Sequence, residues 1–326
     1  MNKLKKALFS LILSPFALIP WGAQAQADYP NKPITIVVPF APGGNLDVSA
    51  RIVTPEMSKI LGQSIIIENK AGAGGAIGHQ AIARANPDGY TLVTTANGSF
   101  TVTPRLQPGK RPFEPGEFTP VGMIGITPCV IEVLATSKFK NLDDLIKYAK
   151  ANPGKVTVGH SGNGTTNHVA ILLFEEAAGI KLNVIPYKGS APALSDLLGG
   201  QIDAVVDQLP SSLNHLRGGK LKALAMTVPK RSVDLPDVPT LDESGFKGFD
   251  VATASGFLAP ANTPAPVIEK LNAALNQSLA NKDVQNRLLG LGSEPSPMTT
   301  AQYRDFLMRE DAKAEALLQR GTLKPE

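Results

Sequence analysis

The chain has 326 residues, of which 43% are hydrophobic, and its 32 Lys and Arg against 28 Asp and Glu give a formal charge of +4. Three of the lysines lie within the first six residues, so the remainder is close to neutral, and no basic stripe with interleaved aromatic residues indicates nucleic-acid binding. The single cysteine, Cys129, cannot form an intrachain disulfide and lies in an apolar run, which is typical of a small buried residue.

Residues 1–27 are typical of a secretory signal peptide. The lysines precede an apolar run over residues 7–21, and the small-x-small pattern of a cleavage site then ends at Ala25 and again at Ala27. A membrane anchor is the alternative, but the run is short, contains two prolines, and no later stretch approaches the ~20 apolar residues that a span requires. We therefore expect export and cleavage near Ala25 or Ala27.

The first part of the mature chain alternates strand and helix patterns, which predicts a parallel α/β architecture. Strands are expected at residues 34–40, 64–69 and 90–97, with helices at 46–61 and 79–85, the first of which is expected to stop at Gly62. Asn45 is expected to cap the first of these helices, and Pro55 to kink or break it.

A polar, proline-rich stretch at residues 104–122 separates this series from a second one. The second series is expected to contain strands at 123–135, 155–159, 183–187, 202–208 and 221–228, and helices at 142–154, 168–179, 191–200 and 211–219. Asn141 is expected to cap the first of its helices.

The C-terminal part returns to a strand at residues 251–260, followed by helices. Thr263 with Pro264 is expected to start one helix, and Thr299 with Gln302 forms a capping-box pattern for another. We therefore predict two lobes, residues 28–124 with 253–326 and residues 125–252, because two strands would cross between them. Two crossings form a hinge with a cleft suited to closing on a small molecule.

The stretch "PFAPGGNLD", residues 39–47, joins a predicted strand to a helix through Gly43 and Gly44. Free N–H groups and the positive end of the helix dipole would attract an anion there. Asp47 would oppose a carboxylate in this position, so it could instead bind an amino group or orient the loop. An ordinary strand-to-helix connection is the alternative for this loop taken alone.

The stretch "HSGNGTTNH", residues 160–168, offers hydroxyl and backbone donors before a helix of the other predicted lobe. Open α/β sheets bind ligands at the carboxyl ends of their strands, and both loops are predicted to lie at such ends. The pair therefore indicates a small-molecule site between the lobes.

Patterns for catalysis and cofactors are weak. In "AGAGGAIG", residues 71–78, Ile77 occupies the position of the third glycine of a dinucleotide motif, and no G-x-S-x-G elbow or metal-ligand spacing occurs. His168 acting as a base for Ser161 or Thr165 would make an exported hydrolase, but no third group to orient the histidine is recognisable. We predict no enzyme activity, no cofactor and no metal.

Several stretches resemble the Bug family, the TctC-like extracytoplasmic receptors of tripartite tricarboxylate transporters. They are "YPNKPITIVVPFAPGGNLDVSAR", "IIIENKAGAGGAIGHQAIARANPDGYTL", "VGHSGNGTTNHV" and "IPYKGSAPALSDLLGGQIDAVVDQLPSSLNHLRGGKLKALAMT". The resemblance implies a two-lobed periplasmic binding protein of type II, with a mostly parallel sheet flanked by helices in each lobe. It also implies a periplasmic receptor that closes on a small organic acid and delivers it to membrane permease subunits. We expect a monomer, because such a receptor needs no second subunit to close. A ligand-sensing subunit of a signalling system would have the same binding chemistry.

Matching positions in the family imply a set of ligand-binding residues. These are Phe40, Ala41, Gly43, Gly44, Asp47, Asn97, Gly98, Ser99, Ser161, Gly162, Gly164, Thr165, His168, Tyr187, Lys188 and Asp207.

Overall fold

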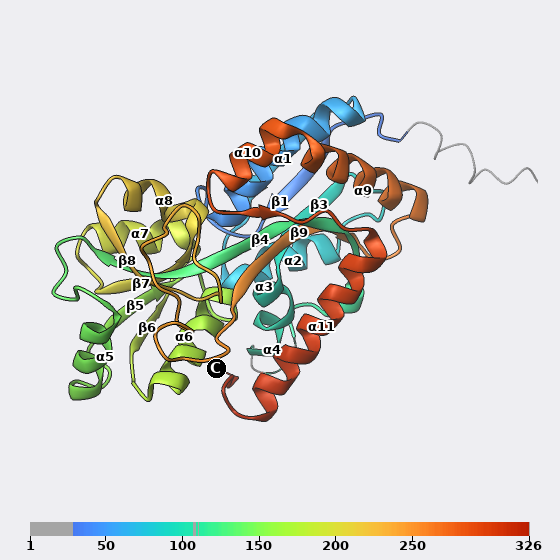
Figure 1. The fold of residues 1–326 in the computed structure, drawn as a ribbon. Coiled ribbons are helices and arrows are strands. Elements are labelled where there is room, and N and C mark those ends of the chain that lie inside the picture. Colours follow the sequence, from blue (N-terminus) through green and yellow to red (C-terminus); the bar gives the residue numbers. More distant parts are fainter. Residues whose placement is uncertain (1–28, 107–108, 110, 326) are drawn as a thin grey trace, which may run out of the picture.

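The structure is a computed structural model that describes residues 29–325 apart from 107, 108 and 110. The predicted signal peptide and its cleavage positions lie outside these residues. The described chain forms two α/β lobes that share the long strand β4 (Phe118–Leu134), which runs from one lobe into the other (Figure 1). No described helix is both long and apolar enough to cross a bilayer.

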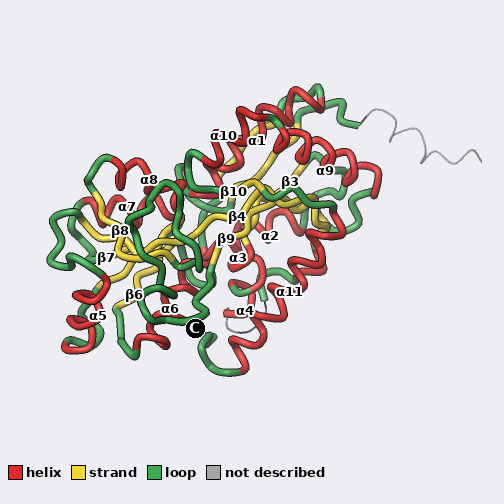
Figure 2. The backbone as a smooth tube through the Cα atoms, in the orientation of Figure 1, coloured by secondary structure: helices red, strands yellow, loops and turns green. Residues whose placement is uncertain are grey.

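The strands form one curled sheet with the order β2-β1-β3-β9-β4-β7-β5-β6 (Figure 2). The first lobe holds β1 (Ile34–Val38), β2 (Ile65–Asn69), β3 (Thr91–Ala96) and β9 (Ala252–Pro260), and the second holds β5 (Thr157–His160), β6 (Asn183–Pro186), β7 (Ala204–Gln208) and β8 (Leu221–Met226). Neighbours are parallel within β1 to β3 and within β5 to β7, whereas β4 is antiparallel to β7, β8, β9 and the short β10 (Glu294–Pro295).

Helices pack around both halves of this sheet. Around the first half lie α1 (Asn45–Leu61), α2 (Ala76–Ala83), α3 (Asn97–Thr101), α4 (Thr103–Leu106), α9 (Ala265–Ala280), α10 (Lys282–Leu289), α11 (Thr300–Gln319) and the 3-10 turns η1 (Ala73–Gly75) and η2 (Pro115–Glu117). Around the second lie α5 (Leu142–Ala151), α6 (Thr166–Ala178), α7 (Ser190–Leu198) and α8 (Leu209–Arg217).

The continuous apolar run of β1 has a direct packing reason. Ile34, Ile36 and Val38 face a core shared with α1 and α9, while Val37 faces a second core that contains Tyr303 of α11. A strand covered on both faces needs apolar residues at every position rather than at alternate ones. Separate clusters hold the second lobe, where Ile131 of β4 packs with α5 and α6.

Three predicted caps are confirmed. Helix α1 ends at Gly62 in the left-handed conformation, the Asn141 side chain accepts a hydrogen bond from the Asp144 amide, and Thr299 forms a capping box with Gln302. Each of these caps depends only on residues that are close in the sequence, so tertiary packing does not alter it.

Three other local predictions are wrong. Pro55 does not break α1, which continues through it, because the nearby Val53 and Met57 are buried in the core and hold the helix there. Asn45 is the first helical residue and Gly44 is the N-cap. The Thr263 hydroxyl donates to the Pro260 carbonyl at 2.8 Å, so α9 begins without a side-chain cap after Pro264.

Strand β4 also carries a carboxyl group in the interior of the second lobe. Glu132 has no solvent exposure; its Oε1 accepts a hydrogen bond from the Ser212 hydroxyl at 2.5 Å, and its Oε2 has no partner among the described residues. Burial, together with the nearby Asp207 carboxylate, raises the pKa of Glu132 well above its ordinary value. The folded protein therefore holds a proton on this side chain to a higher pH than the unfolded chain does.

Glu132→Gln is expected to change the pH dependence of stability. The carboxyl of the unfolded chain ionises near pH 4.5, so the wild type loses about 1.4 kcal/mol of stability per pH unit above that value until the folded carboxyl ionises too. The variant, which carries a neutral glutamine at this position, does not lose stability in this way. Urea unfolding at several pH values should show the difference growing in favour of the variant, whereas Glu269→Gln, on the exposed face of α9, should show none. A difference independent of pH would contradict the buried proton.

Candidate functional site

A small cavity of about 30 Å³ lies between the two lobes, where the loops after β1, β3, β5, β6 and β7 meet. Its lining consists of Phe40, Gly44, Asn45, Leu46, Ala96, Ser99, Ser161, Thr165, Thr166, Asn167, Ser190, Gln208 and Thr253. All of these residues lie in the described chain, and none carries a formal charge. The cavity therefore recognises its occupant through neutral dipoles.

Three helices begin at this cavity. Gly44 precedes α1, Thr165 precedes α6, and Ser190 is the first residue of α7. The first backbone N–H groups of a helix have no partner within the helix, and its N-terminus carries a partial positive charge. Three such ends converging on one uncharged cavity favour an anion.

One buried side-chain donor in the cavity has no partner. Asn45 is 4% exposed, and its Nδ2 makes no hydrogen bond with any described residue. A buried polar group left unpaired costs about 1–3 kcal/mol. The cavity therefore has a donor ready for an acceptor atom of a ligand.

Four other polar side chains of the cavity are held by one another. The Asn167 Oδ1 accepts from Ser161 Oγ at 3.0 Å and from Gln208 Nε2 at 2.7 Å, and Gln208 Nε2 also donates to Thr253 Oγ1 at 2.8 Å. This network joins α6, β7 and β9, so it orders the inner wall before any ligand contact is made.

An open groove of about 780 Å³ continues from the same loops toward solvent. It is lined by Ala41, Pro42, Asn69, Ala71, Ala73, Gly74, Gly162, Asn163, Pro186, Tyr187, Lys188 and Pro192. The Ala41 amide donates to the Lys188 carbonyl at 3.0 Å across the lobes. Cavity and groove together form the cleft, with a narrow inner end and a wide mouth.

The structure places nine of the sixteen predicted ligand-binding residues on the cleft. The cavity holds Phe40, Gly44, Ser99, Ser161 and Thr165, and the groove holds Ala41, Gly162, Tyr187 and Lys188. The other seven are Gly43, Asp47, Asn97, Gly98, Gly164, His168 and Asp207, which support the cleft from behind or join its walls.

Asp47 orients the first loop. Its carboxylate accepts hydrogen bonds from the Gly43 amide, from Arg51 Nε and from Asn69 Nδ2, each at 3.0 Å. Burial acts to raise the pKa of Asp47, but the hydrogen bonds from Arg51, Gly43 and Asn69 outweigh it and hold that pKa below its ordinary value. Of the two roles predicted for Asp47, this arrangement supports the loop-orienting one.

Asn97, Gly98 and Gly164 lie where the two lobes touch. Asn97 Oδ1 accepts a hydrogen bond from Thr166 Oγ1 at 2.9 Å, and the Thr103 hydroxyl donates to the Asn163 carbonyl at 3.0 Å. Gly98 packs directly on the backbone of Thr166, and Gly164 packs on Thr103. The lobes are therefore in a closed arrangement, held by contacts that need small residues.

His168 stacks on His160 with ring centroids 4.6 Å apart, behind the second loop. The Gly164 amide donates to His168 Nδ1 at 3.1 Å, and the Gly162 amide donates to His160 Nδ1 at 3.2 Å. Burial lowers the pKa of His168 to about 4, and burial with the neighbouring His168 lowers that of His160 to about 3. Both rings are neutral near pH 7 and serve as acceptors that shape the loop.

Asp207 lies directly beneath the cavity without lining it. It is fully buried; its Oδ1 accepts from Ser190 Oγ at 2.5 Å and from Asn167 Nδ2 at 3.3 Å, while Oδ2 has no partner among the described residues. Burial raises the pKa of Asp207 to about 6, although these hydrogen bonds act to lower it. A titratable carboxyl thus supports two side chains of the cavity wall.

Sequence reasoning missed eight residues of the cavity. They are Asn45, Leu46, Ala96, Thr166, Asn167, Ser190, Gln208 and Thr253. Seven of them lie within two residues of a predicted contact, so widening each loop would have found them. Ser190 begins a helix that the sequence did show, but Thr253 lies inside a strand with no local signal.

A two-lobed α/β fold that encloses an uncharged, donor-rich cavity between its lobes defines a solute receptor of the periplasmic binding protein type. The family model described as the tripartite tricarboxylate transporter family receptor matches residues 49–323. The chain belongs to this family, and the predicted Bug-family resemblance is confirmed.

Solved structures of relatives agree with this assignment. The periplasmic binding protein BugD is 37% identical, with a TM-score of 0.87 over 91% of this chain and 100% of BugD. MatC (Rpa3494) from Rhodopseudomonas palustris with bound malate is 34% identical, with a TM-score of 0.84 over 89% of this chain and 99% of MatC. R. palustris Rpa4515 with adipate is 32% identical, with a TM-score of 0.87 over 92% of this chain and 100% of Rpa4515. The predicted two-lobed fold is confirmed.

Proposed function

We propose that the cleft binds a small organic acid whose carboxylate enters the inner cavity while the rest of the molecule lies in the groove. The unpaired Asn45 Nδ2 carries this proposal, since a carboxylate oxygen would satisfy it at the meeting point of three helix N-termini. The malate and adipate named for MatC and Rpa4515 are both dicarboxylates, which supports the same ligand class for this chain.

The binding cycle that we propose is a hinged closure. The inner cavity is small, at about 30 Å³, and contacts between the lobes, such as Thr166 with Asn97 and Ala41 with Lys188, close over it. A dicarboxylate therefore enters only when the lobes separate. The moving bodies are residues 28–124 with 253–326 and residues 125–252. They stay linked through β4 and through the segment near Val251, whose amide donates to the Thr227 carbonyl at 2.8 Å.

The same proposal places the protein in the periplasm as a monomer that delivers its ligand unchanged to membrane permease subunits. Ser161 Oγ donates to Asn167 and Thr165 Oγ1 donates to the Gly162 carbonyl, so neither hydroxyl is directed at His168. His168 Nδ1 is itself occupied by the Gly164 amide. This geometry supports binding over an exported hydrolase, because no nucleophile is paired with a base.

Calorimetric titration of the mature chain tests this function. Malate and adipate are compared with their diamides, which have the same shape without charge. We expect at least one acid to bind in the micromolar range or tighter and to raise the melting temperature, while its diamide does not. Asn45→Leu, which removes the unpaired donor, should weaken binding of the acid at least tenfold. Equal binding of acid and diamide would refute a carboxylate site.

Thr166→Val is expected to weaken acid binding moderately. Valine keeps the volume of the side chain but removes the hydroxyl that joins Thr166 to Asn97 across the lobes. The loss of one such hydrogen bond costs about 1 kcal/mol, which is about fivefold in Kd. Thr101→Val is the matched control, because the Thr101 hydroxyl donates to the Asn97 carbonyl within one lobe. An equal loss of affinity in both variants would show that the Thr166 bond is not specific to closure.

A further inference from the structure

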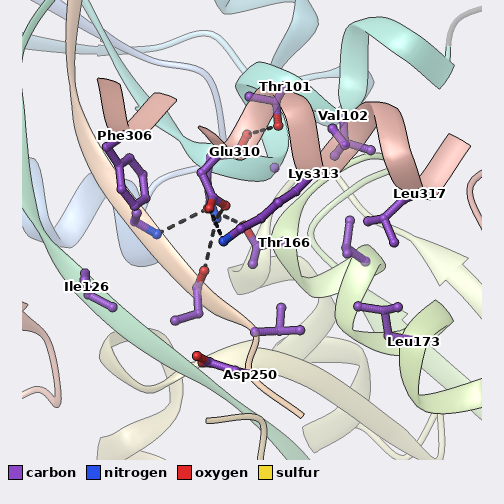
Figure 3. Close-up of a pocket in the computed structure, with 17 residues that line it drawn as sticks. Thr101, Val102, Ile126, Thr166, Leu173, Asp250, Phe306, Glu310, Lys313 and Leu317 are labelled. Carbon is purple, nitrogen blue, oxygen red and sulfur yellow. Dashed lines mark hydrogen bonds and ion pairs between the residues drawn. The ribbon is translucent and has the colours of Figure 1, made fainter. Parts of the chain in front are cut away.

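A second cavity lies on the far side of α3 from the cleft. It has a volume of about 290 Å³, near the lower end of the ~300–1,000 Å³ of small-molecule sites. Figure 3 shows Glu310, Lys313, Phe306 and Leu317 of α11 on one side of it and Asp250 on another. We refer to it as the hinge-side pocket, because it lies beside the segment that enters β9.

The walls of the hinge-side pocket combine apolar and polar side chains and come from both proposed lobes. Val102, Ile126, Phe306 and Leu317 belong to the first lobe or to β4, and Val169 and Leu173 belong to α6 of the second lobe. A molecule with an apolar body would gain about 25 cal/mol for each Å² of apolar surface that these walls remove from water.

The charges at the pocket favour a cation. Glu310 and Asp250 are opposed by only one positive side chain, Lys313, whose ammonium already lies 2.6 Å from Glu310 Oε1. The Glu310 carboxylate is 14% exposed, whereas the Lys313 side chain is 70% exposed. Asp250 forms no ion pair with any described residue. A ligand ammonium in the pocket would neutralise the remaining negative charge.

The pocket is joined to the cleft through a shared wall. Thr166 lines both cavities, and Asn97 donates to Glu310 Oε2 at 2.8 Å while accepting from Thr166 at 2.9 Å. The Glu310 carboxylate therefore fixes the same Asn97 side chain that joins the closed lobes.

We infer that the hinge-side pocket is a second binding site, which takes a small primary amine with an apolar body and favours the closed arrangement of the lobes. A ligand that touches walls from both lobes binds best when those walls are together. By reciprocity, the amine and the organic acid in the cleft each strengthen the binding of the other. This coupling rests on the proposed function of the cleft, but binding of the amine does not.

Calorimetric titration of the mature chain with three probes of similar shape tests the site. The probes are 2-phenylethylammonium, the neutral 2-phenylethanol and the anionic 3-phenylpropionate. We expect the ammonium to bind at least tenfold more tightly than the other two. A preference for the anion when a saturating acid ligand already occupies the cleft would show that Lys313 dominates, and equal binding of all three, or no binding, would refute a cation site.

Variants locate the site. Asp250→Asn should weaken the ammonium about tenfold, and Ala252→Leu, which puts a larger side chain on the pocket wall, should remove its binding. Asp237→Asn is the matched control, because Asp237 is an exposed acid of the same loop that does not line the pocket. Equal effects of Asp250→Asn and Asp237→Asn would show surface attraction only.

A saturating acid ligand in the cleft should strengthen the binding of the ammonium. Competition between the two ligands would place both in the cleft and overturn the second site.

Discussion

Gly98→Ala is expected to weaken the organic-acid ligand at least 100-fold while leaving the fold intact. An alanine Cβ at this position would overlap the Thr166 amide nitrogen and lie 2.8 Å from the Thr165 carbonyl carbon and 3.0 Å from the Gly164 oxygen. These are backbone atoms of the opposite lobe, so no side-chain rotation relieves the overlap. The closed arrangement, in which the three helix N-termini meet, is therefore blocked.

The same substitution is compatible with the first lobe taken alone. Gly98 lies in α3 and has no positive φ, so alanine fits its backbone and is preferred over glycine in a helix by up to about 1 kcal/mol. We expect an unchanged or slightly higher melting temperature without ligand. The loss of affinity corresponds to about 3 kcal/mol, since closure supplies the contacts of one whole wall.

Calorimetry with malate or adipate, combined with small-angle scattering, separates these effects. Wild type should become more compact with saturating acid, whereas Gly98→Ala should stay open. Gly116→Ala is the matched control, because a Cβ there meets nothing within 4 Å. Tight binding by Gly98→Ala would mean that the contact between Gly98 and Thr166 is not needed for the bound state.

The sequence predicted the parts of the site that are local. The loop after β1 and the loop after β5 are recognisable in the sequence because glycines or hydroxyl residues stand between a strand and a helix. Both loops reach the cleft. The family resemblance extended this set to Tyr187 and Lys188, which line the groove. Helix ends such as Gly62 and Asn141 were predicted for the same reason, since their chemistry involves only nearby residues.

The sequence could not show which predicted residues contact a ligand and which support those that do. Asp47 lies in the first turn of α1 and Asp207 lies near the end of β7, so both are close to the cleft. Asp47 is held by Arg51 from the same helix, whereas Asp207 lies under Ser190 from another element. Gly98 gives no signal of its role, because the atoms that it approaches belong to a loop more than sixty residues away. Such distinctions depend on how the lobes meet.

The affinity for the organic acid is expected to fall as the pH rises, because of the buried Asp207 carboxyl. Its pKa of about 6 means that the free protein carries a partly ionised carboxyl beneath Ser190, next to the proposed carboxylate position. A bound carboxylate repels this second negative charge and so favours the protonated form. Burial favours the neutral forms of the other acidic groups close to Asp207, because it raises the pKa of Glu132 well above its ordinary range and that of Cys129 to about 12.

The sign of the effect follows from linkage. Binding of the acid raises the pKa of Asp207 above about 6, so the complex takes up a proton, and the affinity falls as the pH rises through that value. One unit of further shift is about 1.4 kcal/mol, or about tenfold in Kd between about pH 5.5 and about pH 8. Calorimetry in two buffers of different ionisation enthalpy should detect the proton uptake directly.

Asp207→Asn cannot take up this proton, so its affinity should change with pH only as far as the ligand itself titrates. Glu132→Gln should keep the pH dependence of the wild type. A wild-type profile that matches Asp207→Asn would place the ligand carboxylate too far from Ser190 to interact with the buried acid.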